Sequence, residues 1–334
     1  MEELKNREIT ISDIAREAGV SKSTVSRVIS NPSLVKKSTH EKILALIKRS
    51  GYIPNNLAQS LAGSSTKTIG VIIDELSNFF FIEMAEGIDS VISDAGYSML
   101  LCSSRWIAER EESLVRSMIS NRVSGVLLAP VSEKSKSISL LEKRGIPFVL
   151  MDCIPKSRKI SCVAVDNYKG GQIAGKFINE CHKQQLIVIT GYDHQTITNR
   201  IAGLKDTLNP SIKMKHYSGI KTQNEGYNFV PILLVKEQID HIPTMLFVTN
   251  DNVAIGIINR LIEQKVPVPG RLSVLGYDNI KPAAICRSPL TTIHQPIFDM
   301  GKIAAAELLE KIADPHRPPC HRILEPSLVR RESA

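Results

Sequence analysis

The twenty residues from Thr10 to Ile29, TISDIAREAGVSKSTVSRVI, constrain the fold of this chain more than any other stretch. Apolar residues recur at helical spacing on one face of each of two short segments. In the first segment they are Ile11, Ile14, Ala15 and Ala18, and in the second Val25, Val28 and Ile29. The turn between them is Gly19-Val20-Ser21, in which the glycine can take positive φ and the serine can cap the second helix. This pattern predicts a helix-turn-helix.

Two further signals mark where helices of this unit begin. Thr10, with Asp13 three residues later, gives the first helix its start. Ser38 with Glu41 predicts a second capping box, at the start of a third helix. That helix would carry the apolar residues Ile43, Leu46 and Ile47.

The outward side of the second helix indicates what the unit binds. It carries Lys22, Ser23, Ser26 and Arg27, short or cationic groups that can hydrogen-bond base edges and phosphates in a DNA major groove. The apolar spacing alone would fit a generic three-helix bundle equally well. The order of the residues favours DNA binding.

The same stretch, with GYIPNNLAQSLAG downstream, resembles the headpiece and hinge of transcription factors of the lactose/galactose repressor (LacI/GalR) family, and the resemblance covers nearly the whole chain. It implies that Lys22 and Ser23 read bases and that Arg27 contacts a base and a phosphate. It also implies that the segment from Asn55 to Ala62 becomes a helix on operator DNA, with Leu61 wedged into the minor groove. The residues expected at DNA are Thr10, Ser21, Lys22, Ser23, Thr24, Ser26, Arg27, Asn55, Ala58 and Leu61.

The short length of the hinge segment is consistent with a helix that folds only on DNA. An isolated helix of this length is too short to be stable in water, so ordering only on a partner is reasonable. A short helix that is permanently ordered against the core is the alternative.

Charge and composition narrow the classes of partner. The net charge is +8, and residues 1–63 hold ten Lys or Arg against six Asp or Glu, so less than a fifth of the chain carries half of the excess. Such a cluster suits a polyanion. The charged start MEELKNREIT and the lack of a long apolar run predict a cytoplasmic protein without a membrane span. The six cysteines and the histidines lack metal-ligand spacing, so we expect free thiols, no metal and no cofactor.

From residue 68 onward, short apolar runs alternate with amphipathic stretches. Strands are expected at 69–73, 99–102, 126–129, 148–151, 163–166, 186–190, 213–217, 245–248 and 272–276. Helices are expected at 81–95, 108–121, 137–144, 168–180, 198–208, 225–235 and 251–264. Two sets of strand-helix alternation predict an α/β core of two doubly wound lobes with parallel sheets covered on both faces.

The expected organisation is a headpiece at 1–53, a hinge and linker at 54–67, and a two-lobed core at 68–334. The N-lobe would comprise about 68–165 and 296–323, and the C-lobe about 166–295 and 324–334. The family resemblance implies a periplasmic-binding-protein-like core with three crossovers, near Val165, Gln295 and Ile323.

Ligands of open α/β sheets bind beyond the carboxyl ends of the strands, so the polar residues that follow strands are the candidates for an effector site. By resemblance, the cleft between the lobes would hold a carbohydrate. The candidates are Asn78, Phe80, Phe81, Arg105, Asp152, His194, Thr196, Arg200, Asn250, Asp278 and Gln295.

Arg105 departs from the family pattern, because many sugar-binding relatives have an aspartate there. A guanidinium donates a planar fork suited to carboxylate or phosphate. Asp152-Cys153 stands where Asp-Arg is common, so one cationic group is lost and another gained. The sequence therefore suggests an anionic effector, such as a sugar acid or sugar phosphate.

Several of these candidate residues also have a purely structural interpretation. Phe80 and Phe81 could be ordinary core residues, Arg105 could be a surface ion-pair residue, and Asp251 could either bind ligand or cap the helix that follows it.

Together these observations predict a homodimeric DNA-binding repressor of genes for carbohydrate uptake or catabolism, controlled by a small carbohydrate. A carbon-catabolite regulator that answers to a partner phosphoprotein is the alternative. A transporter's solute-binding protein would need a signal peptide and would lack the helix-turn-helix. No nucleophile, nucleotide-binding or metal motif in the sequence supports an enzyme.

Overall fold

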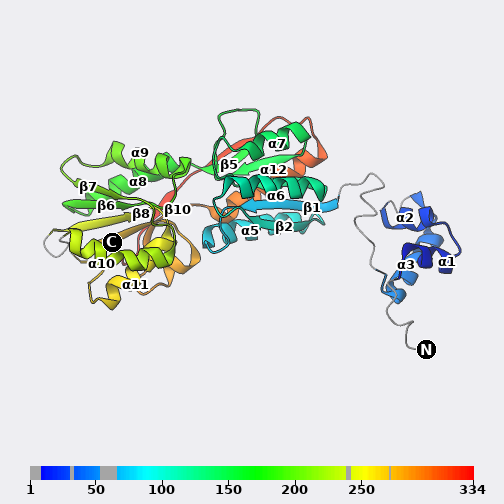
Figure 1. The fold of residues 1–334 in the computed structure, drawn as a ribbon, viewed down its shortest axis with the longest axis horizontal. Coiled ribbons are helices and arrows are strands. Elements are labelled where there is room, and N and C mark those ends of the chain that lie inside the picture. Colours follow the sequence, from blue (N-terminus) through cyan, green and yellow to red (C-terminus); the bar gives the residue numbers. More distant parts are fainter. Residues whose placement is uncertain (1–8, 31–33, 53–65, 238–241, 271) are drawn as a thin grey trace. The chain divides into compact units, whose positions relative to one another are not determined.

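A computed structural model describes residues 9–30, 34–52, 66–237, 242–270 and 272–334 of the chain (Figure 1). The chain divides into two compact units, Met1–Thr66 and Lys67–Ala334. The hinge residues Asn55, Ala58 and Leu61 lie outside the described ranges.

In its described residues, the first unit contains the helices α1 (Ile11–Ala18), α2 (Lys22–Ser30) and α3 (Lys37–Ser50). Their inward faces form one small core with Ile14, Val25 and Ile43 fully buried. Gly19 ends α1 at φ 70°, a left-handed conformation that glycine adopts without steric cost. The side-chain oxygen of Ser21 accepts a hydrogen bond from the backbone N–H of Thr24 at 3.2 Å. The predicted helix-turn-helix is confirmed.

One of the two predicted helix starts is correct and the other is wrong. The carboxylate of Asp13 accepts hydrogen bonds from the backbone N–H of Thr10 at 3.0 Å and from its hydroxyl at 2.6 Å. In contrast, α3 begins before Ser38, with Lys36 at its N-cap position. Val35, just before that position, is partly buried against the core of the unit.

The second unit consists of two α/β lobes, as predicted (Figure 1). The strands of the N-lobe are β1 (Thr66–Ile73), β2 (Ser98–Ser103), β3 (Val123–Leu128), β4 (Phe148–Met151), β5 (Cys162–Val165) and β11 (His321–Leu324). Its helices are α5 (Phe79–Ile92), α6 (Ala108–Ser120), α7 (Lys136–Arg144) and α12 (Ile297–Ala313).

The C-lobe has the same layered construction. Its strands are β6 (Gln185–Ile189), β7 (Lys213–Tyr217), β8 (Thr244–Val248), β9 (Leu272–Asp278), β10 (Thr291–His294) and β12 (Ser327–Val329). Its helices are α8 (Asn167–Glu180), α9 (Gln195–Thr207), α10 (Gln223–Glu237), α11 (Asp251–Glu263) and the short 3-10 helix η2 (Lys281–Ala284).

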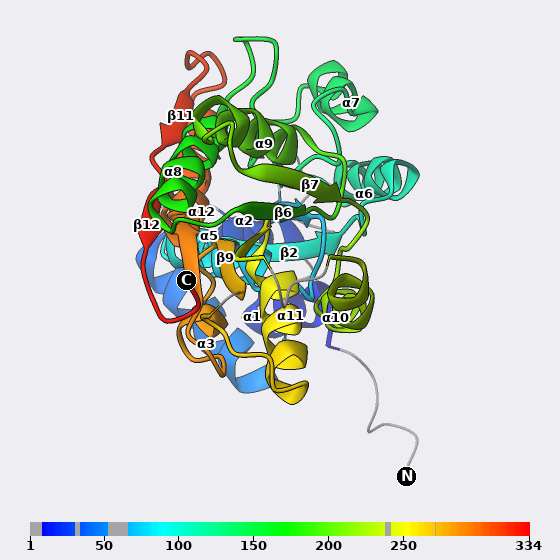
Figure 2. The same ribbon diagram turned by 90° about the vertical axis from the view of Figure 1, so that its left-hand side faces the viewer.

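Each lobe has one six-stranded sheet, in the order β11-β5-β4-β3-β1-β2 or β12-β10-β9-β8-β6-β7. Central strands such as β3, β4, β6 and β8 are buried at every residue, whereas the edge strands β2 and β7 consist mostly of exposed and half-buried residues. Helices cover both faces: α8 and α9 lie on one side of the C-lobe sheet, and α10 and α11 on the other (Figure 2).

The pairing is parallel in β1–β2, β3–β4, β4–β5, β5–β11, β6–β7, β6–β8, β8–β9 and β9–β10. The exception is β12, which pairs antiparallel with β10. The alternation seen in the sequence ended at residue 276, so it did not predict β10, α12, β11 or β12.

Three passages of the chain connect the lobes. The chain leaves β5 for α8, returns from β10 to α12, and runs from β11 to β12. These passages bring the carboxyl ends of both sheets to the boundary between the lobes. Within the described ranges, each helix is too short or too polar to traverse a lipid bilayer.

Helices α8 and α9 cross in close contact because each has a glycine at the crossing. A Cβ added at Gly203 would lie 1.9 Å from the carbonyl oxygen of Tyr168, and one at Gly171 would lie 2.0 Å from that of Arg200. A backbone carbonyl cannot move aside cheaply, so the crossing accepts only glycine at these positions.

We expect Gly203→Ala to destabilise the C-lobe by about 1 to 3 kcal/mol, because the added methyl group forces α8 and α9 apart. Urea unfolding measures this change. Ala202→Ser adds one heavy atom at the exposed neighbouring position and should change stability by less than about 0.5 kcal/mol. If helix propensity decided the outcome, Gly203→Ala would instead stabilise by about 1 kcal/mol, which would contradict the packing argument.

Candidate functional site

A pocket of about 540 Å³, partly open to solvent, lies between the two lobes. Its walls come from residues that follow the strands of both sheets, where ligands of parallel sheets bind. They are Glu75, Asn78, Phe80, Phe81, Trp106, Asp152, Gly191, Tyr192, Thr196, Ile197, Arg200, Lys221, Thr249, Asn250 and Asp278.

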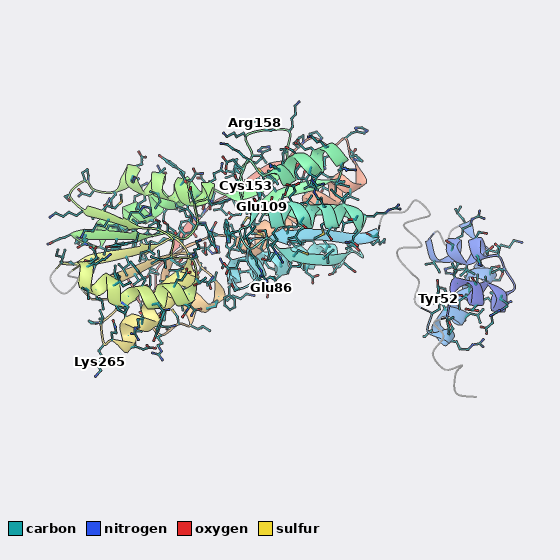
Figure 3. The ribbon with its side chains drawn as sticks, viewed as in Figure 1. Tyr52, Glu86, Glu109, Cys153, Arg158 and Lys265 are labelled. Atoms are coloured by element: carbon teal, nitrogen blue, oxygen red, sulfur yellow. The ribbon has the colours of Figure 1, made fainter. Side chains whose placement is uncertain are left out.

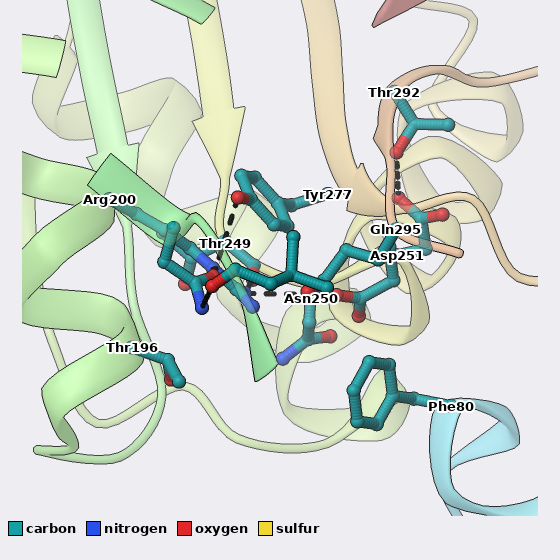
Figure 4. A network of polar contacts seen from close by, with 12 residues as sticks. Phe80, Thr196, Arg200, Thr249, Asn250, Asp251, Tyr277, Thr292 and Gln295 are labelled. Atoms are coloured by element: carbon teal, nitrogen blue, oxygen red, sulfur yellow. Dashed lines mark hydrogen bonds and ion pairs between the residues drawn. The ribbon is translucent and has the colours of Figure 1, made fainter. Parts of the chain in front are cut away.

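Arg200, on α9, is the buried cation of the pocket wall (Figure 4). Its Nε donates to Asn167 Oδ1 at 2.7 Å, and its Nη1 donates to the carbonyl oxygen of Thr249 at 2.6 Å. Nη1 also lies 3.7 Å from Asp278 Oδ1, and the guanidinium stacks 3.7 Å above the centroid of the Tyr277 ring. Protein groups therefore already compensate much of the charge and hydrogen-bonding capacity of Arg200.

A second layer of polar groups holds Asp278 in place. Gln295 donates from Nε2 to Asp278 Oδ1 at 2.7 Å, and the Oε1 atom of Gln295 is buried with no hydrogen-bond partner in the described structure. Asp251 accepts from the hydroxyl of Thr292 at 2.7 Å and from the backbone N–H of Ile280 at 3.1 Å. Asp251 thus braces the loop after β9 and neither lines the pocket nor caps α11.

The buried carboxyls of this layer hold their protons more strongly than carboxyls in water. Burial raises the pKa of Asp278, with Arg200 opposing the shift, and burial together with the charge of Asp278 raises the pKa of Asp251 well above its usual range. The two carboxyls share one low-dielectric region, so ionisation of one disfavours ionisation of the other.

Asp152, which follows β4, brings a carboxyl from the N-lobe. The residue is partly exposed, but its Oδ1 atom is covered and lacks a hydrogen-bond partner within the described ranges. Burial raises the pKa of Asp152 to about 7, and the charge of Arg200 acts in the opposite direction. An uncompensated acceptor in a pocket wall is where a ligand hydroxyl would bind.

Two asparagines of the wall also begin helices. Asn78 Oδ1 accepts from the N–H of Phe80 at 3.0 Å and caps α5, while Asn250 Oδ1 accepts from the N–H of Val253 at 2.9 Å and caps α11. Phe80 and Phe81 meet edge to face, with ring centroids 5.1 Å apart, and belong both to the core and to the pocket wall. Phe80 and Phe81 are therefore core residues and pocket residues at the same time, so the two alternatives from the sequence do not exclude each other.

Backbone strain gathers at the ends of the strands that face the pocket. Positive φ angles occur at Arg105 (55°) and Trp106 (59°) after β2, at Asp152 (51°) after β4, and at Asp278 (118°) and Asn279 (61°) at the end of β9. Such conformations cost non-glycine residues about 1 kcal/mol or more each. They persist where the surrounding structure holds a side chain in a particular direction.

Contacts across the pocket hold the lobes together. The Trp106 ring stacks on the Tyr192 ring with centroids 4.1 Å apart, and Asn252 Nδ2 donates to Asn78 Oδ1 at 2.5 Å. Outside the pocket, Lys281 forms an ion pair at 2.5 Å with Glu86 of α5, the residue labelled in Figure 3. The side-chain amide of Gln195 exchanges hydrogen bonds with both backbone groups of Ile154, at 3.2 and 3.3 Å.

Eight of the eleven sequence-predicted residues line this pocket: Asn78, Phe80, Phe81, Asp152, Thr196, Arg200, Asn250 and Asp278. Gln295 lies behind Asp278, as described above. His194 is buried at the start of α9, where its Nδ1 lies 2.9 Å from the hydroxyl of Thr196, and burial lowers the pKa of His194 so that the ring stays neutral. Gln295 and His194 thus affect the pocket through the wall residues Asp278 and Thr196.

Arg105 is the third predicted residue outside the lining of the pocket, and it does not act on the pocket through a wall residue. It is exposed and lines an adjoining hollow on the N-lobe side. The left-handed turn at Arg105 and Trp106 instead puts the indole of Trp106 in the wall of the pocket. The family resemblance assigned the ligand-binding position by order along the chain, whereas the turn places Trp106, the residue after Arg105, in the wall.

Sequence reasoning missed several wall residues, chiefly Glu75, Trp106, Tyr192, Lys221 and Thr249. A usable signal existed for Trp106 and Tyr192, since each is an aromatic residue a few positions beyond an apolar strand. Lys221 follows the exposed edge strand β7, whose alternating pattern gives no sign of a nearby pocket.

The second candidate surface is α2 of the first unit. Lys22, Ser23 and Arg27 are exposed, Thr24 and Ser26 are half-buried, and Val25 and Val28 face the core. Thr10 and Ser21 are exposed at the starts of α1 and α2. The outward residues of α2 thus form one cationic and hydroxyl-bearing face.

A helix-turn-helix unit joined to a two-lobed α/β core with a pocket between the lobes defines a ligand-controlled class of DNA-binding regulator. Residues 10–55 match the family described as bacterial regulatory proteins, lacI family, and residues 176–334 match the periplasmic binding protein-like domain.

The chain is 33% identical over 310 residues to the HTH-type transcriptional repressor PurR of Vibrio atlanticus, covering 91% of this chain and 92% of that protein. It is 32% identical over 302 residues to catabolite control protein A of Priestia megaterium, covering 89% and 90%. A crystal structure of a LacI family transcriptional regulator from Enterococcus faecalis with bound ribose is similar at a TM-score of 0.72 and 30% identity, covering 80% of this chain and 98% of that one. The chain therefore belongs to the lacI family of bacterial regulatory proteins, and it is a DNA-binding transcriptional repressor of that family.

The raised pKa of Asp152 gives a testable dependence of stability on pH. The unfolded carboxyl loses its proton near pH 4, whereas the folded one keeps it until about pH 7. The native state therefore binds more protons between these values, so this group lowers the free energy of unfolding as the pH rises from 4 to 7. At pH 8 we expect Asp152→Asn to be more stable than the wild type by about 1 to 2 kcal/mol, less than the full shift implies because the residue is partly exposed.

Urea unfolding at pH 5 and pH 8 measures this difference. At pH 5, only about one unit above the pKa of the unfolded carboxyl, most of this effect has not yet developed, so the difference between the two proteins should be markedly smaller than at pH 8. Equal stability at pH 8 would show that Asp152 is ionised without cost, contrary to the expected effect of burial.

Proposed function

We propose that this repressor acts as a homodimer on genes for the uptake or catabolism of a carbohydrate, and that a neutral carbohydrate in the inter-lobe pocket is its effector. The observation that carries the proposal is the acceptor-rich pocket, in which Asp152 Oδ1 lacks a partner among the described residues. Two headpieces would bind the two half-sites of a near-palindrome, as dimers of helix-turn-helix proteins do.

The DNA-reading face proposed is the outward side of α2. Lys22 and Ser23 would contact base edges near the start of the helix, and Arg27, one turn on, would contact a base or a phosphate. Thr10, Ser21, Thr24 and Ser26 would support these contacts from the helix starts and the flank of α2. The hinge residues Asn55, Ala58 and Leu61 complete the proposed interface.

Arg27→Ala should weaken binding to the operator by about 1 to 3 kcal/mol, because it removes a guanidinium that reads the groove. Fluorescence anisotropy on a DNA site selected from a random library measures this loss. Arg49→Ala removes the same kind of side chain from α3, where it is paired with Glu17, and should leave the affinity nearly unchanged. Equal losses in both variants would indicate unspecific charge attraction instead.

The choice of a neutral carbohydrate follows from the charges around the pocket. Glu75, Asp152 and Asp278 bring three carboxyls to its wall, against the two cations Lys221 and Arg200. Lys221 is exposed and lies against the Tyr192 ring, whereas Arg200 is already bound to Asn167, Thr249 and Asp278. The sequence-based expectation of a sugar acid or sugar phosphate depended on Arg105, which lines a different hollow. Carboxylates accept hydrogen bonds from neutral hydroxyls and repel added negative charge. A relative of known structure holds ribose, a neutral sugar.

Control of DNA binding would come from the two lobes. An effector that binds one relative arrangement of the lobes more tightly than another shifts the population toward the arrangement that it prefers. It changes operator affinity only to the extent that its affinities for the two arrangements differ. The contacts between Asn78 and Asn252 and between Gln195 and Ile154 belong to the arrangement described above. An effector that strengthens this arrangement would also strengthen these contacts.

A thermal-shift screen tests the effector class. At a hundred times its dissociation constant a ligand stabilises the native state by about 2.7 kcal/mol, which raises the melting temperature visibly. We expect hits among neutral sugars, D-ribose included, and none among sugar acids or sugar phosphates. Asp152→Ala should lose the response, because it removes a carboxylate that bonds a ligand hydroxyl, whereas Arg105→Ala should keep it.

Other outcomes of the screen would point elsewhere. Hits among the acids or phosphates that vanish in Arg105→Ala would restore the anionic effector. A panel without any hit would favour a partner phosphoprotein as the signal, the alternative that the sequence left open.

A further inference from the structure

Trp106 and Tyr192 stand between two hollows of the core. Together with Glu75, these two residues line both the inter-lobe pocket and the adjoining hollow of about 960 Å³ that contains Arg105 and Arg110. Their rings are nearly parallel, with an interplanar angle of 16° and centroids 4.1 Å apart. The stacked pair therefore forms part of the partition between an inner and an outer compartment.

The stack joins the lobes, since Trp106 follows β2 of the N-lobe and Tyr192 follows β6 of the C-lobe. His194 meets the indole edge-on at 5.6 Å, so two C-lobe rings hold it. Lys221 lies 4.8 Å from the centroid of the Tyr192 ring, and because Trp106 covers one face of that ring, the ammonium group lies over the other.

The turn that carries Trp106 is held firmly despite its strain. The N–H groups of Ser104 and Arg105 donate to the carbonyl oxygens of Ile73 and Asp74, each at 2.8 Å. The hydroxyls of Ser103 and Ser104 donate to Asp74 at 2.9 and 3.0 Å. These bonds fix two successive left-handed residues, Arg105 and Trp106. Strain held in this way marks a side chain whose direction matters.

The indole of Trp106 is also incompletely satisfied. Its Nε1 atom is buried, and in the described part of the chain it has no hydrogen-bond partner. Buried indole N–H groups usually find an acceptor. An oxygen of a ligand in the pocket would supply one.

From these observations we infer that Trp106, stacked on Tyr192, is a specificity-determining residue that limits the effector to a single sugar ring by closing the inner pocket against the outer hollow. This inference rests on the proposed function, because it assumes a carbohydrate in the pocket. Truncation of the indole would join the two compartments, and the cleft would then accept a second sugar unit beside the first.

The partition can be tested without any ligand, because Trp106 is the single tryptophan of the chain and gives all of its tryptophan fluorescence. Acrylamide should quench the full-length protein several-fold less than free N-acetyltryptophanamide. Tyr192→Leu should increase the quenching constant about twofold or more, because the indole loses the ring that covers it. Tyr168→Leu removes a tyrosine elsewhere on the C-lobe and should leave the quenching unchanged. Free-indole quenching in the wild type, or no change in Tyr192→Leu, would overturn the partition.

Size selection is tested by thermal shift with matched sugars, D-glucose with cellobiose and maltose, D-galactose with lactose, and D-ribose alone. The wild type and Trp106→Phe, which keeps a stacked ring, should respond to a monosaccharide and not to a disaccharide that contains it. Trp106→Ala should respond to both, with its preference for the single ring reduced roughly tenfold or more. The inference is wrong if the wild type binds the disaccharide equally well or if Trp106→Ala keeps the wild-type preference. If no sugar stabilises any of these proteins, the carbohydrate effector fails, and the quenching experiment still decides whether the partition exists.

Discussion

The buried guanidinium of Arg200 is the interaction on which the core of this protein depends. A charge removed from water must be compensated inside the protein. Here α8 supplies Asn167, the end of β8 supplies the carbonyl of Thr249, and the end of β9 supplies Asp278. Gln295 then holds Asp278, so the passage from β10 to α12 is tied to the same group. One cation thereby fixes the relative positions of the elements that form the C-lobe side of the pocket.

The pocket is also where the protein tolerates its least favourable local conformations. Left-handed residues follow β2, β4 and β9, and uncompensated polar atoms occur at Trp106, Asp152 and Gln295 in the described structure. Backbone hydrogen bonds hold such positions, as where the N–H groups of Ser104 and Arg105 donate to Ile73 and Asp74 in the turn after β2. The two functional surfaces differ in chemistry accordingly: α2 presents donors and positive charge to DNA, whereas the pocket presents acceptors to a small molecule.

Much of the fold was predictable because its signals are local. A few neighbouring residues are enough to identify the apolar faces of α1 and α2 and the glycine and serine of their turn. The same holds for the apolar strands between β1 and β9. The segment from Thr291 to Val329 was not predicted. Its strands β10, β11 and β12 have three or four residues each, and β11 and β12 lie at the edges of their sheets, where pairing with a distant segment decides whether a strand forms. The start of α3 was misplaced because the helix begins at Lys37 without a side-chain hydrogen bond at its N-cap, so the capping pattern at Ser38 does not mark its first turn.

The sequence by itself determined the class of each unit and most of the polar residues at the carboxyl ends of the strands, because hydrophobic periodicity and turn chemistry act over short distances. Only the tertiary structure decided which of those residues face one another. It placed Trp106 in the pocket wall and Arg105 outside it, since a left-handed turn redirects neighbouring side chains without leaving a mark on the apolar pattern. It also decided that Asp251 holds the loop after β9 and that the Oδ1 atom of Asp152 has no hydrogen-bond partner in the described structure. Burial and hydrogen-bond partners come from distant segments that meet only in the folded chain.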